Sequence, residues 1–268
     1  MINLNFGLWH SGCKLSYLRY LTFKSLRHFH PDSKIQLFVG TKYKNDSHNW
    51  NVEKQDFENP DSIKKDYIPE LSELGVEVHY VDWFGQYSSN VGADMFRYWF
   101  VKAFSGFYLD TDQIILKSFN TLPLDVDLIY SGYKALSCGY YFPVGVLGGS
   151  KKSEILRVVM KVLPNIISSN NYNSSGPFGF RSILESRECN KWSDKMFNAP
   201  SNYFYPIPES YRVNEIYSGS LKVTDESYAL HYYLGHPLSQ EFNKKYTREF
   251  AATSNDTISC LCRKMEII

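Results

Sequence analysis

Residues 106–112 read Gly106-Phe107-Tyr108-Leu109-Asp110-Thr111-Asp112, an aromatic and apolar stretch that runs straight into two carboxylates. In open α/β sheets, ligands bind beyond the carboxyl ends of the strands. Asp110 and Asp112, one residue apart on a turn at such an end, can both face a hard divalent cation such as Mg²⁺ or Mn²⁺. Such an ion would bridge a diphosphate and neutralise the charge that grows on it as it leaves. The stretch therefore predicts a metal site at the tip of a buried strand.

A second triplet of the same pattern, Asp125-Val126-Asp127, serves as an internal control. It precedes the apolar run that begins at Leu128, so it stands at the wrong end of its strand. Two acidic residues in a turn are common and are usually only solvated. We interpret this triplet as a surface turn, and position favours Asp110 and Asp112 as the metal ligands.

A helix is expected directly before the quoted stretch, closed by Gly106. Asp94 and Arg97 are three apart in it, and as an exposed ion pair they would contribute only about 0.2–0.5 kcal/mol. Four residues recur at helical spacing and predict one buried face: Phe96, Trp99, Phe100 and Ala103.

Working outward, the remaining pattern alternates strands and helices. Strands are expected at 2–8, 35–39, 76–81, 128–133 and 140–147, and helices at 14–27, 62–74 and 153–167. Gly75 suits the C-terminal cap of the second helix, and the polar segment 41–61 is expected to be an exposed insertion. The last hundred residues are less regular. This order predicts one α/β domain over 1–268 with a mostly parallel central sheet.

The bulk composition narrows the class of protein. Of 268 residues, 43% are hydrophobic, and 29 basic against 28 acidic residues leave a formal net charge of +1. That balance argues against nucleic acid as a partner, because nucleic-acid binding needs a basic face. No signal peptide or transmembrane segment is recognised, and five cysteines without a Cys-x-x-Cys pair favour free thiols. A cytoplasmic location is the expectation.

The run Ala93-Asp94-Met95-Phe96-Arg97-Tyr98, followed by residues 106–112, resembles the core signature of glycosyltransferase family 32, which includes initiating mannosyltransferases. More distantly it resembles clostridial glucosylating toxins. In those proteins a helix bearing Ser/Ala-Asp-x-x-Arg precedes a Gly-x-Tyr-Leu-Asp-x-Asp strand. Ser105-Gly106 is a departure, since the family usually has two glycines there.

The resemblance implies a GT-A-type, Rossmann-like domain that transfers a hexose from a nucleotide sugar, with retention, to a hydroxyl of a glycan, polysaccharide or protein. Residues 1–117 would bind the donor, and 118–268 would form the acceptor side and the C-terminal loops. Mn²⁺ or Mg²⁺ is the implied cofactor. A UDP-sugar is preferred to a GDP-sugar if Trp9 stacks on the base, and GDP-mannose stays open as the donor. No base or enzyme nucleophile is assigned.

The same resemblance implies roles for individual residues. Asp94 would bind donor hydroxyls, Arg97 the sugar or its phosphate, and Tyr98 would complete this donor-binding group. Asp110 would reach the ribose and the metal, and Asp112 would be the main metal ligand.

Three further positions stay open at this point. Trp9 suits stacking on a base, although a buried core role is equally consistent with its type. A late histidine near the metal is implied, and His231 fits better than His236. Gly176-Pro177 matches a short pair in the family that would shape the acceptor side.

Two other classes of protein remain as alternatives. A haloacid-dehalogenase-like phosphatase also uses Asp-x-Asp after a strand, but here Ile114 stands where Thr or Val is usual and no downstream Asp-Asp pair occurs. A non-catalytic sugar- or nucleotide-binding protein on a degenerate transferase fold is the other. It would bind nucleotide sugars without turnover, and the intact acidic pair argues against it.

Overall fold

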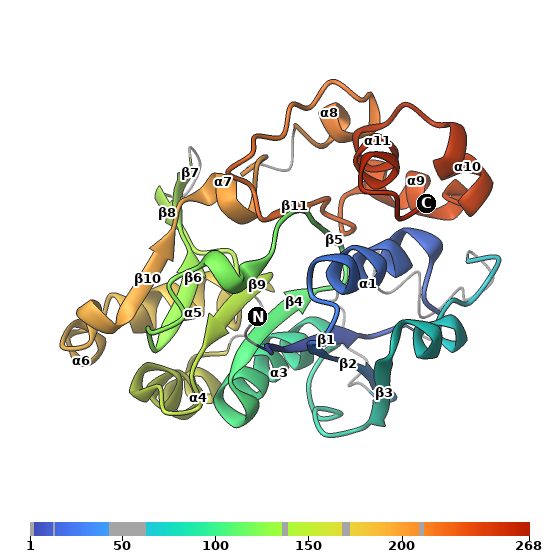
Figure 1. Ribbon diagram of the computed structural model, residues 1–268. Coiled ribbons are helices and arrows are strands. Elements are labelled where there is room, and N and C mark those ends of the chain that lie inside the picture. Colours follow the sequence, from blue (N-terminus) through green and yellow to red (C-terminus); the bar gives the residue numbers. More distant parts are fainter. Residues whose placement is uncertain (1–2, 13, 43–62, 136–138, 168–171, 209–211) are drawn as a thin grey trace.

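The computed structural model describes residues 3–12, 14–42, 63–135, 139–167, 172–208 and 212–268. Its centre is a seven-stranded sheet in the order β10-β6-β9-β4-β1-β2-β3, with helices on both faces (Figure 1). The strands of this sheet are β1 (Asn5–His10), β2 (Lys34–Gly40), β3 (Val76–Val81), β4 (Gly106–Asp110), β6 (Leu128–Ser131), β9 (Val146–Gly149) and β10 (Met196–Ala199).

The helices and the smaller strands surround this sheet. The α-helices are α1 (Tyr17–Phe29), α3 (Ser89–Phe104), α4 (Glu154–Ile166), α5 (Pro177–Leu184), α6 (Arg187–Asn190), α7 (Ser201–Phe204), α8 (Val213–Tyr217), α9 (Pro237–Lys245), α10 (Arg248–Thr253) and α11 (Thr257–Lys264). The 3-10 helices are η2 (Pro69–Leu74), η3 (Phe119–Thr121), η4 (Tyr172–Ser174) and η5 (Ser193–Lys195). The two-stranded sheets pair β5 (Gln113–Ile115) with β11 (Ala229–His231), and β7 (Tyr133–Ala135) with β8 (Gly139–Tyr141).

The central sheet is mostly parallel, which confirms the predicted fold class. β1 pairs in parallel with β2 and β4, β2 with β3, and β6 with β10. β9 runs antiparallel to its neighbours β4 and β6. The carboxyl ends of β1 and β4 therefore meet at one edge, where Trp9 lies opposite Asp110 in the register.

Side chains of β1 alternate between two cores, one on each face of the sheet. Phe6 and Leu8 pack with α1 and the C-terminal helices, whereas Trp9 packs with α3 in the second core. In Figure 1 the C-terminal helices, coloured orange to red, lie beside α1. Both faces of the central sheet are thus covered.

Several predicted boundaries need correction. Helix α3 ends at Phe104 with Ser105 as its C-cap, so Gly106 does not close the helix but begins β4. Gly106 has φ 104°, and a Cβ there would come within 2.2 Å of the Asn5 carbonyl oxygen, so the close approach to β1 requires glycine. Ala103 is exposed because the buried face of α3 narrows at its last turn.

Other expectations were met in part. Gly75, with φ 64°, caps the preceding turn as expected, but that turn is only the 3-10 helix η2. The predicted strand 140–147 is wrong, because β8 and β9 belong to two different sheets. Of the expected insertion, residues 43–61 lie outside the described residues, as do two of the five cysteines, and the other three cysteines are free thiols. Within the described chain, no helix has the length and apolar character needed to cross a bilayer.

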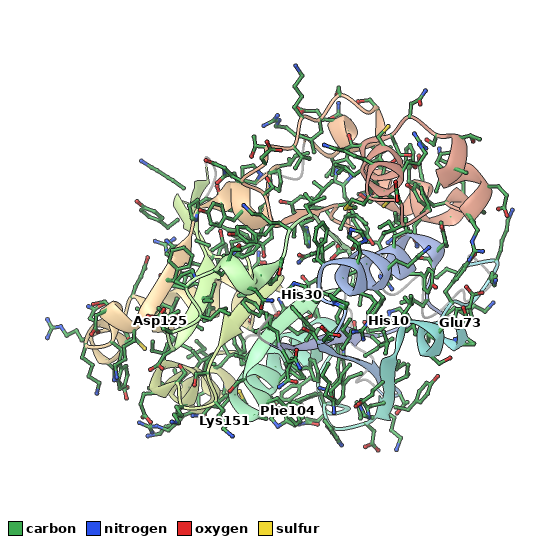
Figure 2. All side chains as sticks on the ribbon, viewed as in Figure 1. His10, His30, Glu73, Phe104, Asp125 and Lys151 are labelled. Carbon is green, nitrogen blue, oxygen red and sulfur yellow. The ribbon has the colours of Figure 1, made fainter. Side chains whose placement is uncertain are left out.

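His30 gives the fold a defined response to pH. It caps the end of α1, is 2% exposed, and its ring Nε2 accepts a hydrogen bond of 3.2 Å from the Phe119 N–H. Burial, followed by the nearby charge of Arg27, lowers the pKa of His30 from 6.5 to about 4. Figure 2 labels His30 near the middle of the view.

Between these two pKa values the unfolded chain binds a proton at His30 and the folded chain does not. The contribution of neutral His30 to the unfolding free energy is therefore complete above pH 6.5 and is lost as the pH falls towards 4. We expect His30→Gln to remove on the order of 2 kcal/mol from the pH dependence of the unfolding free energy between these limits. Urea unfolding at pH 7 and pH 4.5 measures it. His28→Gln, at an exposed position of the same helix, is the control. Equal pH dependence in both variants would contradict this assignment.

Candidate active site

The two aspartates of the quoted stretch lie where the sequence predicts, at the carboxyl end of β4. Asp110 is the last residue of β4, and Asp112 directly precedes β5. β5 pairs antiparallel with β11, and this pairing sets His231 opposite Gln113. A histidine far along the chain is thereby placed beside both aspartates.

Asp110, Asp112 and His231 form a compact group whose candidate ligand atoms all lie within 4.8 Å of one another. The His231 Nε2 lies 3.2 Å from Asp112 Oδ1 and 3.7 Å from Asp110 Oδ2. Two carboxylate oxygens and one imidazole nitrogen are a donor set that suits Mn²⁺, and Mg²⁺ less well because of the nitrogen. His236, the weaker candidate, caps α9 by accepting a hydrogen bond from the Leu238 N–H.

Electrostatics within the group keep Asp110 charged. Burial raises the pKa of Asp110, but the charge of Arg97 and the contact with His231 outweigh burial, so that the pKa falls well below its ordinary value. Burial lowers the pKa of His231, yet Asp112 and Asp110 raise it overall to about 9. Without a metal the imidazolium therefore holds the two carboxylates together, and an ion must displace that proton to bind.

The Asp94–Arg97 pair exists, but it is not an exposed pair on a helix surface. Arg97 Nη2 lies 2.9 Å from Asp94 Oδ1 and 3.6 Å from Asp110 Oδ1, and the side chains of the first pair are only 8% and 10% exposed. The guanidinium also lies 4.8 Å from the centre of the Tyr108 ring. Arg97 therefore links helix α3 to the aspartates at the tip of β4.

Partners that sequence reasoning missed orient this network. The Tyr108 hydroxyl donates to Asp110 Oδ1 at 2.6 Å, and the Ser175 hydroxyl donates to Asp94 Oδ2 at 2.6 Å. Two glycines leave room for the carboxylates, since a Cβ would come within 2.5 Å of Asp110 Oδ2 at Gly145 and within 2.9 Å of Asp94 Oδ2 at Gly176. The Gly176-Pro177 pair thus abuts Asp94.

A single cavity contains most of the predicted residues. It is lined by Trp9, Asp94, Arg97, Asp110, Asp112 and His231 together with others. Trp9 is 5% exposed and its ring packs against Phe96 at 4.8 Å between centroids, so its body belongs to the core while it still borders the cavity. Stacking of Trp9 on a base stays a prediction.

Tyr98 is the predicted donor residue that the structure does not bring to the cavity. Its side chain is fully buried, stacks on Phe180 of α5 at 5.5 Å, and donates a hydrogen bond to the Ser175 carbonyl. Tyr98 stands four residues after Asp94, so the two residues share one face of α3, but the packing of α5 against α3 covers Tyr98. Tyr98 therefore supports helix α3 and the segment at Ser175.

The cavity also has lining residues that sequence reasoning did not assign. They are His10 and Arg19, and four tyrosines: Tyr133, Tyr141, Tyr205 and Tyr233. None belongs to a recognisable motif, and the signal available was only that His10 closely follows the predicted first strand. The control triplet behaves as predicted, because Asp125 is exposed before β6 and lies far from His10 in Figure 2.

Comparison with known proteins agrees with this geometry. Residues 19–128 match the family model described as "Glycosyltransferase sugar-binding region containing DXD motif". No curated protein matches the sequence. Among solved structures the chain is similar to "PaToxG Glycosyltransferase", at 15% identity and TM-score 0.50 over 72% of each chain. It is also similar to the glycosyltransferase GlyE of Streptococcus pneumoniae, at 15% identity and TM-score 0.50 over 100% of this chain and 61% of GlyE.

The chain thus covers about three fifths of the length of GlyE. Because the two sequences are only 15% identical, the similarity concerns the fold. The matched family region contains α3, β4 and both aspartates of the candidate site. Residues 19–128 are thus similar to the DXD-containing sugar-binding region of glycosyltransferases, and the chain has a GT-A-type fold like that of these two structures.

Proposed function

We propose that the chain transfers a hexose from a nucleoside diphosphate sugar to a hydroxyl group, in a reaction that depends on a divalent metal and retains the anomeric configuration. The observation that supports this proposal best is that candidate ligand atoms of Asp110, Asp112 and His231 lie within 4.8 Å of one another. These residues line one cavity together with the Asp94–Arg97 pair. A nucleotide sugar needs a metal ion at its diphosphate and polar side chains at its sugar, and these two groups of residues would supply them.

Asp110, Asp112 and His231 fit a divalent ion by the chemistry of their donor atoms, and Mn²⁺ is the first choice. When bound, such an ion supplies positive charge to a departing diphosphate. Asp94 presents a carboxylate, held by Ser175, that can accept hydrogen bonds from donor hydroxyls. Arg97 presents a fixed positive charge beside it.

The acceptor is proposed to enter on the side of the tyrosines. Tyr133 and Tyr141 lie on the hairpin β7–β8 with ring centroids 5.6 Å apart, and Tyr233 packs edge-on to His231 at 4.4 Å. Aromatic faces next to polar groups pack well on sugar rings, whose C–H faces are apolar. This favours a glycan or polysaccharide over a protein as the acceptor. Residues 1–117 then form the donor side, and 118–268 the acceptor side.

A donor screen tests the proposal. The chain is mixed with UDP- and GDP-hexoses, with Mn²⁺, Mg²⁺ or chelator, and release of nucleoside diphosphate is measured with and without oligosaccharide acceptors. We expect release with at least one donor, a preference for UDP-sugars, and loss of release in chelator. Nuclear magnetic resonance of the product gives the anomeric configuration. Binding of donors without any release would contradict an enzymatic role.

A further inference from the structure

Arg19 is a buried cation in the cavity that the roles above do not use. It is 8% exposed, lines the cavity with Asp112 and Leu234, and its Nη1 donates a hydrogen bond of 3.0 Å to His10 Nδ1. His10 ends β1, so this contact lies at the junction of the first strand and the first helix. In parallel α/β sheets this junction borders the site where ligands bind.

The position of Arg19 on its helix is unfavourable for a purely structural cation. It lies in the first turn of α1, where the helix dipole favours negative charge, and Ser16 already caps its backbone N–H. Departures from such local preferences are expected at functional sites. A bound anion would make the same position favourable, since helix N-termini and arginine both attract phosphate.

His10 holds the guanidinium in a defined place. Its Nε2 lies 3.0 Å from the Lys14 carbonyl oxygen and so carries the proton, which leaves Nδ1 as the acceptor for Arg19. Burial, followed by the charge of Arg19, lowers the pKa of His10 to about 3. The imidazole is therefore neutral and adds no negative charge to the arginine.

Helix α1 is attached directly to the aspartate turn. The Thr22 hydroxyl donates to the Thr111 carbonyl at 2.9 Å, and the Tyr232 hydroxyl contacts the carbonyls of both Leu18 and Thr111 at 3.2 Å. Arg19 follows Leu18, so its backbone is set against the residue between Asp110 and Asp112. The position of the Arg19 guanidinium relative to Asp110, Asp112 and His231 is thereby restricted.

Arg19 shares its cavity with the candidate metal ligands. Among the described lining residues the carboxylates are Asp94, Asp110 and Asp112, and the arginines are Arg19 and Arg97. A diphosphate held by a metal at Asp110 and Asp112 would therefore lie in the same cavity as the Arg19 guanidinium.

We propose that Arg19 binds the diphosphate of the donor, and that His10 is the positioning residue that orients its guanidinium. The inference rests on the proposed function and adds a second, metal-independent contact to the same diphosphate. The fork of the guanidinium suits two phosphate oxygens, which a lysine at this position would not match.

Inorganic pyrophosphate is the sharpest probe, because it carries the charge without a base or a sugar. Calorimetry with pyrophosphate, UDP and GDP is carried out at saturating Mn²⁺ on the full chain and on Arg19→Gln, Arg19→Lys and His10→Phe. Arg157→Gln, an exposed arginine of α4, is the matched control. Mn²⁺ binding alone and thermal unfolding are measured on every variant.

We expect Arg19→Gln to weaken pyrophosphate and nucleoside diphosphate binding about 10- to 100-fold, with Mn²⁺ binding unchanged. Arg19→Lys should retain part of the affinity, and His10→Phe should lose pyrophosphate affinity without losing Mn²⁺. If Arg19→Gln binds pyrophosphate as tightly as the unmodified chain, the proposed role of Arg19 is overturned, but the proposed function is not. If the unmodified chain binds none of the three probes, the proposed function falls as well.

Discussion

Asp112→Asn is expected to lower metal-dependent transfer by about 100- to 1,000-fold while the chain keeps its fold. Asp112 Oδ1 lies 3.2 Å from His231 Nε2, and Oδ2 accepts a hydrogen bond of 2.8 Å from the Leu234 N–H. An amide retains an oxygen for Leu234 but has no charge for a cation. The variant therefore separates the structural contact from the metal contact.

Mn²⁺ affinity and the rate of nucleoside diphosphate release, both over a range of Mn²⁺ concentrations, measure this effect. Asp125→Asn is the matched control, since Asp125 belongs to the second Asp-x-Asp triplet and is exposed. It should bind Mn²⁺ and turn over like the unmodified chain. Normal release by Asp112→Asn, at unchanged Mn²⁺ affinity, would refute a metal role for this aspartate.

Arg97→Met should have two large effects at once, one on stability and one on transfer. The guanidinium is buried between Asp94 and Asp110. Its loss leaves the buried Asp94 carboxylate without its cation and leaves Asp110 with His231 as its cation. Breaking a buried pair in this way costs about 3–5 kcal/mol. Loss of fixed positive charge beside the donor should lower kcat/KM by about 100-fold or more.

Arg157 provides the control, because it forms an ion pair of the same i,i+3 spacing with Glu154 on α4, with side chains 53% and 45% exposed. Arg157→Met should change stability by less than about 1 kcal/mol. Arg97→Lys restores a charge without the fork and should recover stability more than transfer. The buried-network explanation fails if Arg97→Met and Arg157→Met unfold at the same denaturant concentration.

Some features of the site could be read from the chain because they are local. The spacing of Asp94 and Arg97 on a helix, and of Asp110 and Asp112 after a strand, sets the direction of each side chain within its own element. The parallel sheet then brings the carboxyl ends of β1 and β4 to one edge. The placement of both aspartates at the cavity follows from this short-range information.

The limits of that information are visible on the same helix. Tyr98 lies on the same face of α3 as Asp94 but is covered by Phe180. Ala103 continues the apolar pattern of the helix but is exposed. Spacing gives the face of a helix on which a residue lies. It does not give the part of that face that a neighbouring helix buries.

By itself the sequence determined the alternation of strands and helices, the placement of the acidic pair at a strand end, and the choice between the two Asp-x-Asp triplets. Only the tertiary structure decided that His231 lies beside the aspartates while His236 caps α9, that Ser175 donates to Asp94, and that Arg19 contacts His10. The physical reason is range. Local side-chain direction follows from backbone periodicity, whereas these contacts come from strand pairing and loop packing between segments distant in the chain.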